Sequence, residues 1–132
     1  MSRPNITRLN PPTLVTPPGY SQVTLASSGT LIIIAGQVAL DQNGQLVGPG
    51  DPVAQTRQVF HNILAALEAA GAQPQNLLKL TTYITDIAIL STFRSVRDQF
   101  LDPHHPPAST LVQVSSLFRP EFLIEIEALA VS

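Results

Sequence analysis

Several of the predicted strands of this sequence are apolar on both faces, and this feature constrains the fold more than any other. The stretch 31–35 (LIIIA) has no polar side chain, and the last predicted strand, 122–131, is apolar on both sides. Alternate side chains of a strand point to opposite faces, so both faces of the sheet need shielding from water. Periodicity predicts two helices, about 52–70 and 88–101, which can cover only one face. We therefore expect a homo-oligomer in which another copy covers the second face.

Capping signals set the ends of the two helices. Asp51 followed by Pro52 is typical of an N-cap and a first helical residue, and Gly71 provides a left-handed stop. Pro103 ends the second helix, because the residue before a proline is disfavoured in the helical region.

The remaining pattern predicts a single α+β domain spanning 1–132. The turn Ser28-Gly29 predicts that its two flanking strands pair as a hairpin. Five of the 12 prolines fall within residues 1–19, so we expect an extended N-terminal arm over 1–16 that is not a core element. The expected strands are 22–27, 30–37, 78–85, 109–115 and 122–131, with 45–47 as a short addition to the sheet.

Charge and composition exclude several classes of protein. Charged residues make up 12% of the chain, and the net charge is −2, so no dense basic patch is available for phosphates. The absence of cysteine removes disulfides, thiolate metal ligands and cysteine nucleophiles. No apolar run approaches the roughly 20 residues of a membrane span, and no signal peptide is visible. We expect a cytoplasmic protein that binds neither nucleic acid nor membrane.

Two glutamates of the last strand are the main candidates for chemistry. Glu125 and Glu127 are two residues apart, so they share a face at about 6–7 Å, the face expected to contact another subunit. Paired carboxylates divide into general acid and general base when their surroundings separate their pKa values. The alternative is that one pairs with an arginine across the interface and the other is solvated.

Other polar residues give weaker signals. His61 falls on the polar face of the first helix, where we expect solvent exposure. His104 and His105 have no third ligand at a recognisable spacing, so we expect no metal site. Arg94 and Asp98 stand four residues apart in the second helix, which is typical of a surface ion pair.

The sequence resembles the RidA/YjgF/UK114 (Rid) family through a set of short segments. The resemblance implies a chorismate-mutase-like fold with one mixed sheet and two helices on one face. It also implies a homotrimer with ligand clefts between subunits, and no metal or organic cofactor. The segments keep the family's order from about residue 14 to 131: 18–22 (PGYSQ), 35–38 (AGQV), 55–58 (QTRQ) with Asn62, 68–71 (EAAG), 79–82 (KLTT), 107–110 (PAST) and 124–128 (IEIEA).

The best-known members of this family hydrolyse 2-imino and enamino acids to 2-keto acids and ammonia. An arginine holds the substrate carboxylate, backbone groups orient the imine, and a glutamate positions a water. By the resemblance, Tyr20 matches the cleft tyrosine and Glu125 the cleft glutamate. Gly36 matches the cleft glycine, and Ala35 stands where the family often has serine.

The 107–111 segment departs from the family pattern. Ser109 stands at the position of the carboxylate-binding arginine, Leu111 at that of the reactive cysteine, and Thr110 lies between them. A serine hydroxyl makes one neutral hydrogen bond, so a 2-imino acid should bind at least about tenfold to a hundredfold more weakly. Either the ligand is not an α-carboxylate, or Arg94, aligned with a cleft asparagine, supplies the charge. The alternative for Arg94 is its pair with Asp98.

The resemblance therefore predicts a hydrolase similar to 2-iminobutanoate/2-iminopropanoate deaminases, with altered substrate preference. The alternative is a non-catalytic trimer that binds a small metabolite, such as a carboxylic acid. An endoribonuclease or translation inhibitor, a description also attached to this family, fits poorly with a net charge of −2.

Overall fold

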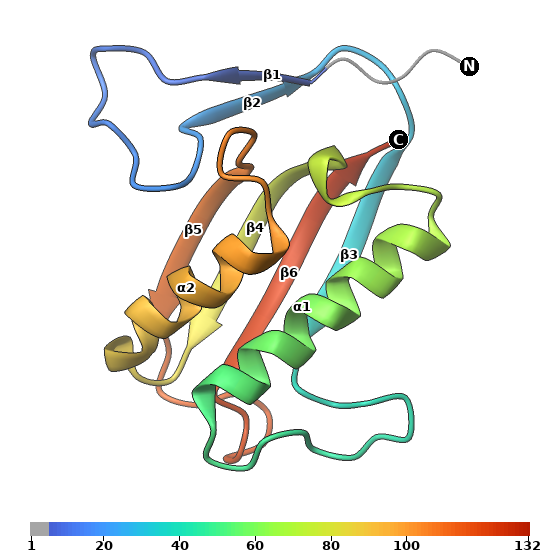
Figure 1. Cartoon of the computed structure of the whole chain (residues 1–132), viewed down its shortest axis with the longest axis vertical. Helices are drawn as coiled ribbons and strands as arrows, with labels where there is room; N and C mark the ends of the chain where they lie inside the picture. The colour runs from blue at the N-terminus through green and yellow to red at the C-terminus, as the bar shows by residue number, and fades with distance from the viewer. Residues whose placement is uncertain (1–5) are drawn as a thin grey trace.

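A four-stranded mixed sheet in the order β3-β6-β4-β5 forms the centre of the computed structural model, which describes residues 6–132 (Figure 1). The central strand β6 runs antiparallel to β3 and β4, while β4 and β5 are parallel. This arrangement confirms the predicted α+β class. The strands are β3 (Leu31–Gln37), β4 (Leu77–Ile84), β5 (Ala108–Gln113) and β6 (Ile124–Val131).

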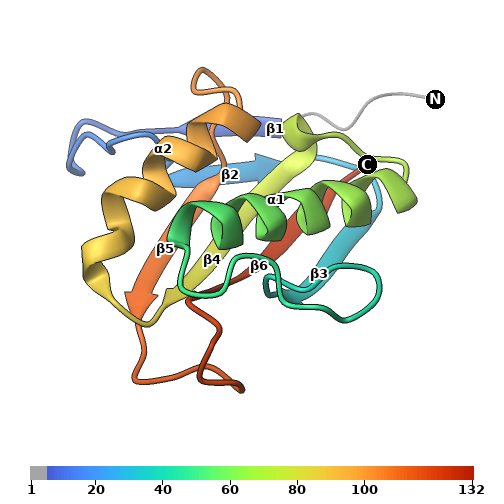
Figure 2. The same cartoon turned by 60° about the horizontal axis from the view of Figure 1, so that its bottom comes forward.

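Both long helices lie on the same face of the sheet (Figures 1 and 2). Helix α1 (Pro52–Ala69) begins as predicted, because the side chain of Asp51 accepts a hydrogen bond from the Ala54 amide. Short 3-10 turns, η1 (Pro74–Asn76) and η2 (Ile87–Ile89), precede β4 and α2 (Leu90–Phe100) respectively. The core between helices and sheet contains these buried side chains: Phe60, Ile63, Leu67, Leu80, Ile84, Phe93, Ile124 and Ile126.

The N-terminal strands pair differently from the prediction. β1 (Ile6–Leu9) pairs antiparallel with β2 (Val23–Ala26) in a separate two-stranded sheet. Residues 6–9 contain no proline, so this part of the predicted arm can form ladder hydrogen bonds; residues 1–5 of the arm lie outside the described residues.

The predicted hairpin of 22–27 with 30–37 is therefore wrong. β3 pairs with β6 instead, and Thr30 and Ser132 exchange backbone hydrogen bonds of 2.8 and 3.0 Å where that pairing ends. The eight-residue β6 offers β3 a longer apolar partner than the four-residue β2 does. The stretch 45–47 does not extend the sheet either, since Leu46 makes only an isolated bridge to Leu40.

The second face of the sheet, which we call the open face, carries apolar side chains that no element within residues 6–132 covers. Ile33 is 74% exposed and Leu31 59% exposed, whereas Ile34, which faces the helices, is 6% exposed. The sequence predicts that 31–35 is buried on both faces. Within a single chain, only the face toward the helices is buried. The open face comprises Leu31, Ile33, Lys79, Thr81, Tyr83, Thr110, Val112, Glu125, Glu127 and Leu129. Among the described residues, neither helix is both long and apolar enough to cross a lipid bilayer.

Candidate functional site

A pocket of about 280 Å³, which we call the edge pocket, lies between α2, the turn at residues 17–20 and the edge strand β5. Its polar lining consists of Tyr20, Arg94, Arg97 and Ser109, and its apolar lining includes Phe93. Three residues that the sequence nominated for the site, Tyr20, Arg94 and Ser109, are therefore brought together here.

The position of Tyr20 beside β5 follows from contacts of the next residue. The Ser21 amide donates to the carbonyl of Pro107 at 3.0 Å, and the Ser21 hydroxyl donates to that of Pro106 at 2.6 Å. Ser21 also forms a parallel bridge with Ala108. These contacts fasten the 17–21 segment to the start of β5, next to Ser109.

The second helix supplies two arginines to this pocket, and only one was nominated. The predicted pair of Arg94 with Asp98 is wrong, because Asp98 binds the Nε of Arg97 at 3.0 Å. Arg94 is exposed and lines the pocket, while Arg97 is 7% exposed. The sequence held a signal for Arg97: it stands four residues after Phe93, within the apolar stripe of the helix.

A second group of nominated residues lies on β3 and β6. A β-bulge between Ile34 and Gln37 interrupts the pairing with β6 and contains Ala35 and Gly36. A Cβ atom at residue 36 would lie 2.6 Å from Oε2 of Glu125. The carboxyl group of Glu125 therefore lies directly against the backbone at Gly36, and a larger residue there would displace it.

The two glutamates of β6 share a face, as predicted, but have different surroundings. Glu127 accepts a hydrogen bond of 2.8 Å from the Tyr83 hydroxyl, and this bond raises the pKa of Tyr83. Burial, followed by the nearby charge of Glu127, raises the pKa of Glu125. A raised pKa suits Glu125 to a role in which it exchanges protons with a substrate.

We predict that Gly36→Ala lowers the rate of a reaction that uses the Glu125 carboxylate by about tenfold to a hundredfold, with little change in the melting temperature. The backbone at residue 36 accepts alanine, but the new methyl group would meet the flexible end of Glu125, which must move. Activity and thermal unfolding measured side by side test this. In a Glu125→Gln background the same substitution should have no further effect, and an additive loss would contradict the explanation.

Within one chain the two groups are far apart. Ser109 belongs to β5 and Gly36 to β3, the outer strands of the four-stranded sheet. Three strand spacings separate them, about 14 Å. Ser109 pairs with buried Leu80 and faces the helices, whereas Glu125 faces the open side. Thr110, also nominated, lies on the open face rather than in the edge pocket.

The histidines lie outside both groups. His61 is exposed, as predicted, with its ring edge-on to that of Phe100 at 5.1 Å. Nδ1 of His105 lies 2.8 Å from a carboxylate oxygen of Asp102, and this hydrogen bond lowers the pKa of Asp102. In residues 6–132, no group of three histidine, cysteine, aspartate or glutamate side chains is placed to hold a metal ion.

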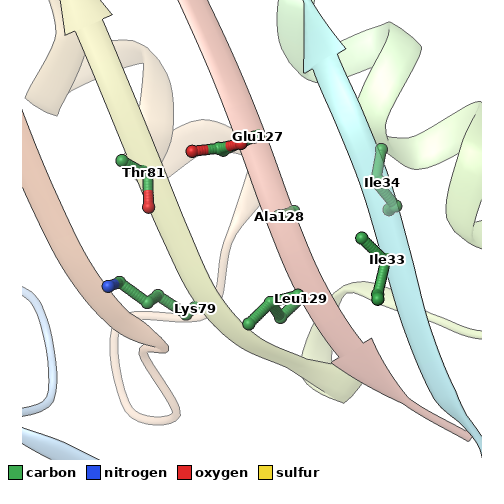
Figure 3. A pocket seen from close by; sticks show the side chains of 7 residues that line it. All are labelled: Ile33, Ile34, Lys79, Thr81, Glu127, Ala128 and Leu129. Atoms are coloured by element: carbon green, nitrogen blue, oxygen red, sulfur yellow. The ribbon is translucent and has the colours of Figure 1, made fainter.

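A hollow of about 270 Å³ lies on the sheet, over β3, β6 and β4 (Figure 3). Its lining comes from three adjacent strands and combines apolar side chains, such as Ile33 and Leu129, with Lys79, Thr81 and Glu127.

Residues 13–132 match the family model described as Endoribonuclease L-PSP. The crystal structure of YyfB from Yersinia pestis, a protein of the conserved Rid family, superposes with a TM-score of 0.89. The two chains are 38% identical, over 97% of this chain and 99% of the other. The chain belongs to the Rid family.

Two further relatives of this Rid protein have names that state a reaction or a ligand. It is 34% identical over 106 residues to the 2-iminobutanoate/2-iminopropanoate deaminase of Escherichia coli K12, covering 78% of this chain and 80% of the relative. The crystal structure of E. coli TdcF with bound serine matches with a TM-score of 0.71 and 30% identity, over 90% of this chain and 91% of that one. The family predicted from the sequence segments is thus confirmed.

Proposed function

We propose that this Rid protein is a homotrimeric hydrolase of small imines or enamines, with sites built between its subunits. The observation that carries the proposal is the separation of the nominated residues into two groups, one at the edge strand β5 and the other on β3 and β6. Three strand spacings, about 14 Å, separate Ser109 from Gly36, and two, about 10 Å, separate the strands of Ser109 and Glu125. Neither group is a complete site by itself. Contact between the β5 edge of one copy and the open face of the next would complete it.

The open face supports this assembly. The apolar side chains there include Ile33, 74% exposed, and Leu129, 36% exposed, and they lie in the same sheet as the bulge that holds Gly36 against Glu125. Covering this face therefore also covers the glutamate. Removal of water from a carboxylate strengthens its hydrogen bonds to a substrate.

The chemistry needs few groups. A cation in the edge pocket binds the substrate carboxylate, and backbone groups at Ala35 and Gly36 orient the imine. Glu125 accepts a proton from a water as the water oxygen attacks the imine carbon, and it passes this proton to the imine nitrogen. The resulting carbinolamine then releases ammonia as its hydroxyl becomes the ketone oxygen. One imine and one water give one ketone and one ammonia, with no bond formed to the protein.

The names of two relatives agree with this class of substrate. One is a deaminase of 2-imino acids, and TdcF holds serine, which also carries an α-carboxylate. The cytoplasmic location expected from the sequence stays a prediction.

The test generates 2-imino acids in solution with an amino-acid oxidase and follows their conversion to keto acids. The purified protein should shorten the imine lifetime in proportion to its concentration. Unchanged imine lifetimes together with saturable binding of a keto acid would contradict catalysis and favour a metabolite-binding trimer.

A further inference from the structure

Arg97 is a charged side chain in a mostly buried position, which requires an explanation. It is 7% exposed, and its guanidinium carbon lies 5.8 Å from the centre of the Phe93 ring. A Cβ atom on Gly19 would clash with its Nη2 atom, so the guanidinium packs directly against the 17–20 turn. Burial of a cation is unfavourable unless its donors find partners.

The ion pair with Asp98 satisfies only part of this group. Asp98 binds the Nε atom, and its own side chain is 54% exposed. Among the residues that the structure describes, this is the hydrogen bond found for Arg97. The Nη1 and Nη2 atoms together carry four N–H donors, and their edge has the geometry that matches a carboxylate.

The edge pocket that Arg97 lines has a cationic character. Two arginines contribute to its lining, and the lining contains no acidic side chain. Tyr20 and Ser109 add hydroxyl groups beside the arginines. Arg94 is exposed at this pocket, so water screens its charge more than that of Arg97.

We propose that Arg97 is the anion-binding residue of the edge pocket and that its Nη edge binds the carboxylate of a small organic acid. The role that the sequence suggested for Arg94 passes to the residue one helical turn later. The proposal rests on the proposed function for the choice of an organic acid as ligand, but binding is measured without any reaction.

The test compares two probes that differ only in charge, pyruvate and its neutral amide, by calorimetric titration of the assembled protein. Native protein should prefer pyruvate. Arg97→Gln should weaken the binding of pyruvate by about tenfold to a hundredfold and leave the binding of the amide nearly unchanged, because a charged bidentate contact is lost. The matched control Arg57→Gln removes an exposed arginine on α1 outside the edge pocket, and it should change pyruvate affinity by less than about threefold.

A second measurement, made on native protein, tests the proposal even if the Arg97→Gln variant does not fold. In native protein, the side-chain NMR signals of the Arg97 guanidinium should shift on addition of pyruvate and not of the amide, with Arg97→Lys used for assignment. Weaker binding of pyruvate to the Arg94→Gln variant, with unchanged binding to Arg97→Gln, would overturn the proposal. Arg97 signals that do not shift when the protein is saturated with pyruvate would also overturn it. Absence of imine hydrolysis with intact pyruvate binding through Arg97 would overturn the proposed function alone.

Discussion

Glu125→Gln is expected to lower the turnover of a 2-imino acid by at least about a hundredfold, because the amide cannot accept a proton from the attacking water. Substrate affinity should change little, since the carboxylate of the substrate binds at the other half of the site. The variant keeps the shape of the side chain, so the contact with Gly36 and the fold should persist. Steady-state kinetics with in situ imine generation gives the kcat and KM of both proteins.

The pH profile provides the control for this prediction. Burial and the charge of Glu127 raise the pKa of Glu125, and the base must be ionised, so turnover should rise with pH through that raised pKa. Glu125→Gln should lose this rise. Glu127→Gln should keep the activity and move the rise to lower pH, because one cause of the pKa shift is removed. A Glu125→Gln protein with native turnover would exclude Glu125 as the base.

Ile33→Asp is expected to abolish assembly and, with it, imine hydrolysis. The side chain is 74% exposed in one chain, so the substitution disturbs little within the protomer. At a subunit contact it would bury a carboxylate, which costs several kcal/mol for each copy. Sedimentation velocity should show the native protein at three times the 14.2 kDa of the chain and the variant at one chain mass.

The matched control is Val53→Asp, which changes an apolar residue that is 40% exposed on α1, away from the open face. It should leave assembly and activity intact. Circular dichroism checks that both variants keep native secondary structure. A native protein that sediments as a single chain, or an Ile33→Asp protein that still assembles, would contradict the interface.

Local chemistry explains what the sequence could predict. The Asp51–Pro52 cap and the stop at Gly71 depend on neighbouring residues, and the structure places the ends of α1 there. The shared face of Glu125 and Glu127 follows from strand geometry and is equally local.

Long-range contacts explain what the sequence could not predict. The choice of β6 rather than β2 as partner of β3 depends on strands about a hundred residues apart in the chain. Arg97 was overlooked because its burial depends on the turn that contains Gly19. This turn is far from Arg97 in the sequence but packs against its guanidinium. The spacing of Arg94 and Asp98 suggested a pair that the adjacent residue Arg97 forms instead.

One group lies at the β5 edge and faces the helices, whereas the other lies on β3 and β6 with Glu125 on the open face, and this placement has a consequence for how copies meet in the proposed assembly. A contact that joins unlike surfaces cannot be two-fold symmetric, and it ends only when a ring closes. Each chain in such a ring contributes to two sites. Its arginine lies in the site shared with one neighbour, and its glutamate lies in the site shared with the other. Chains damaged at different edges could therefore rescue each other when mixed, since some junctions would join two undamaged halves.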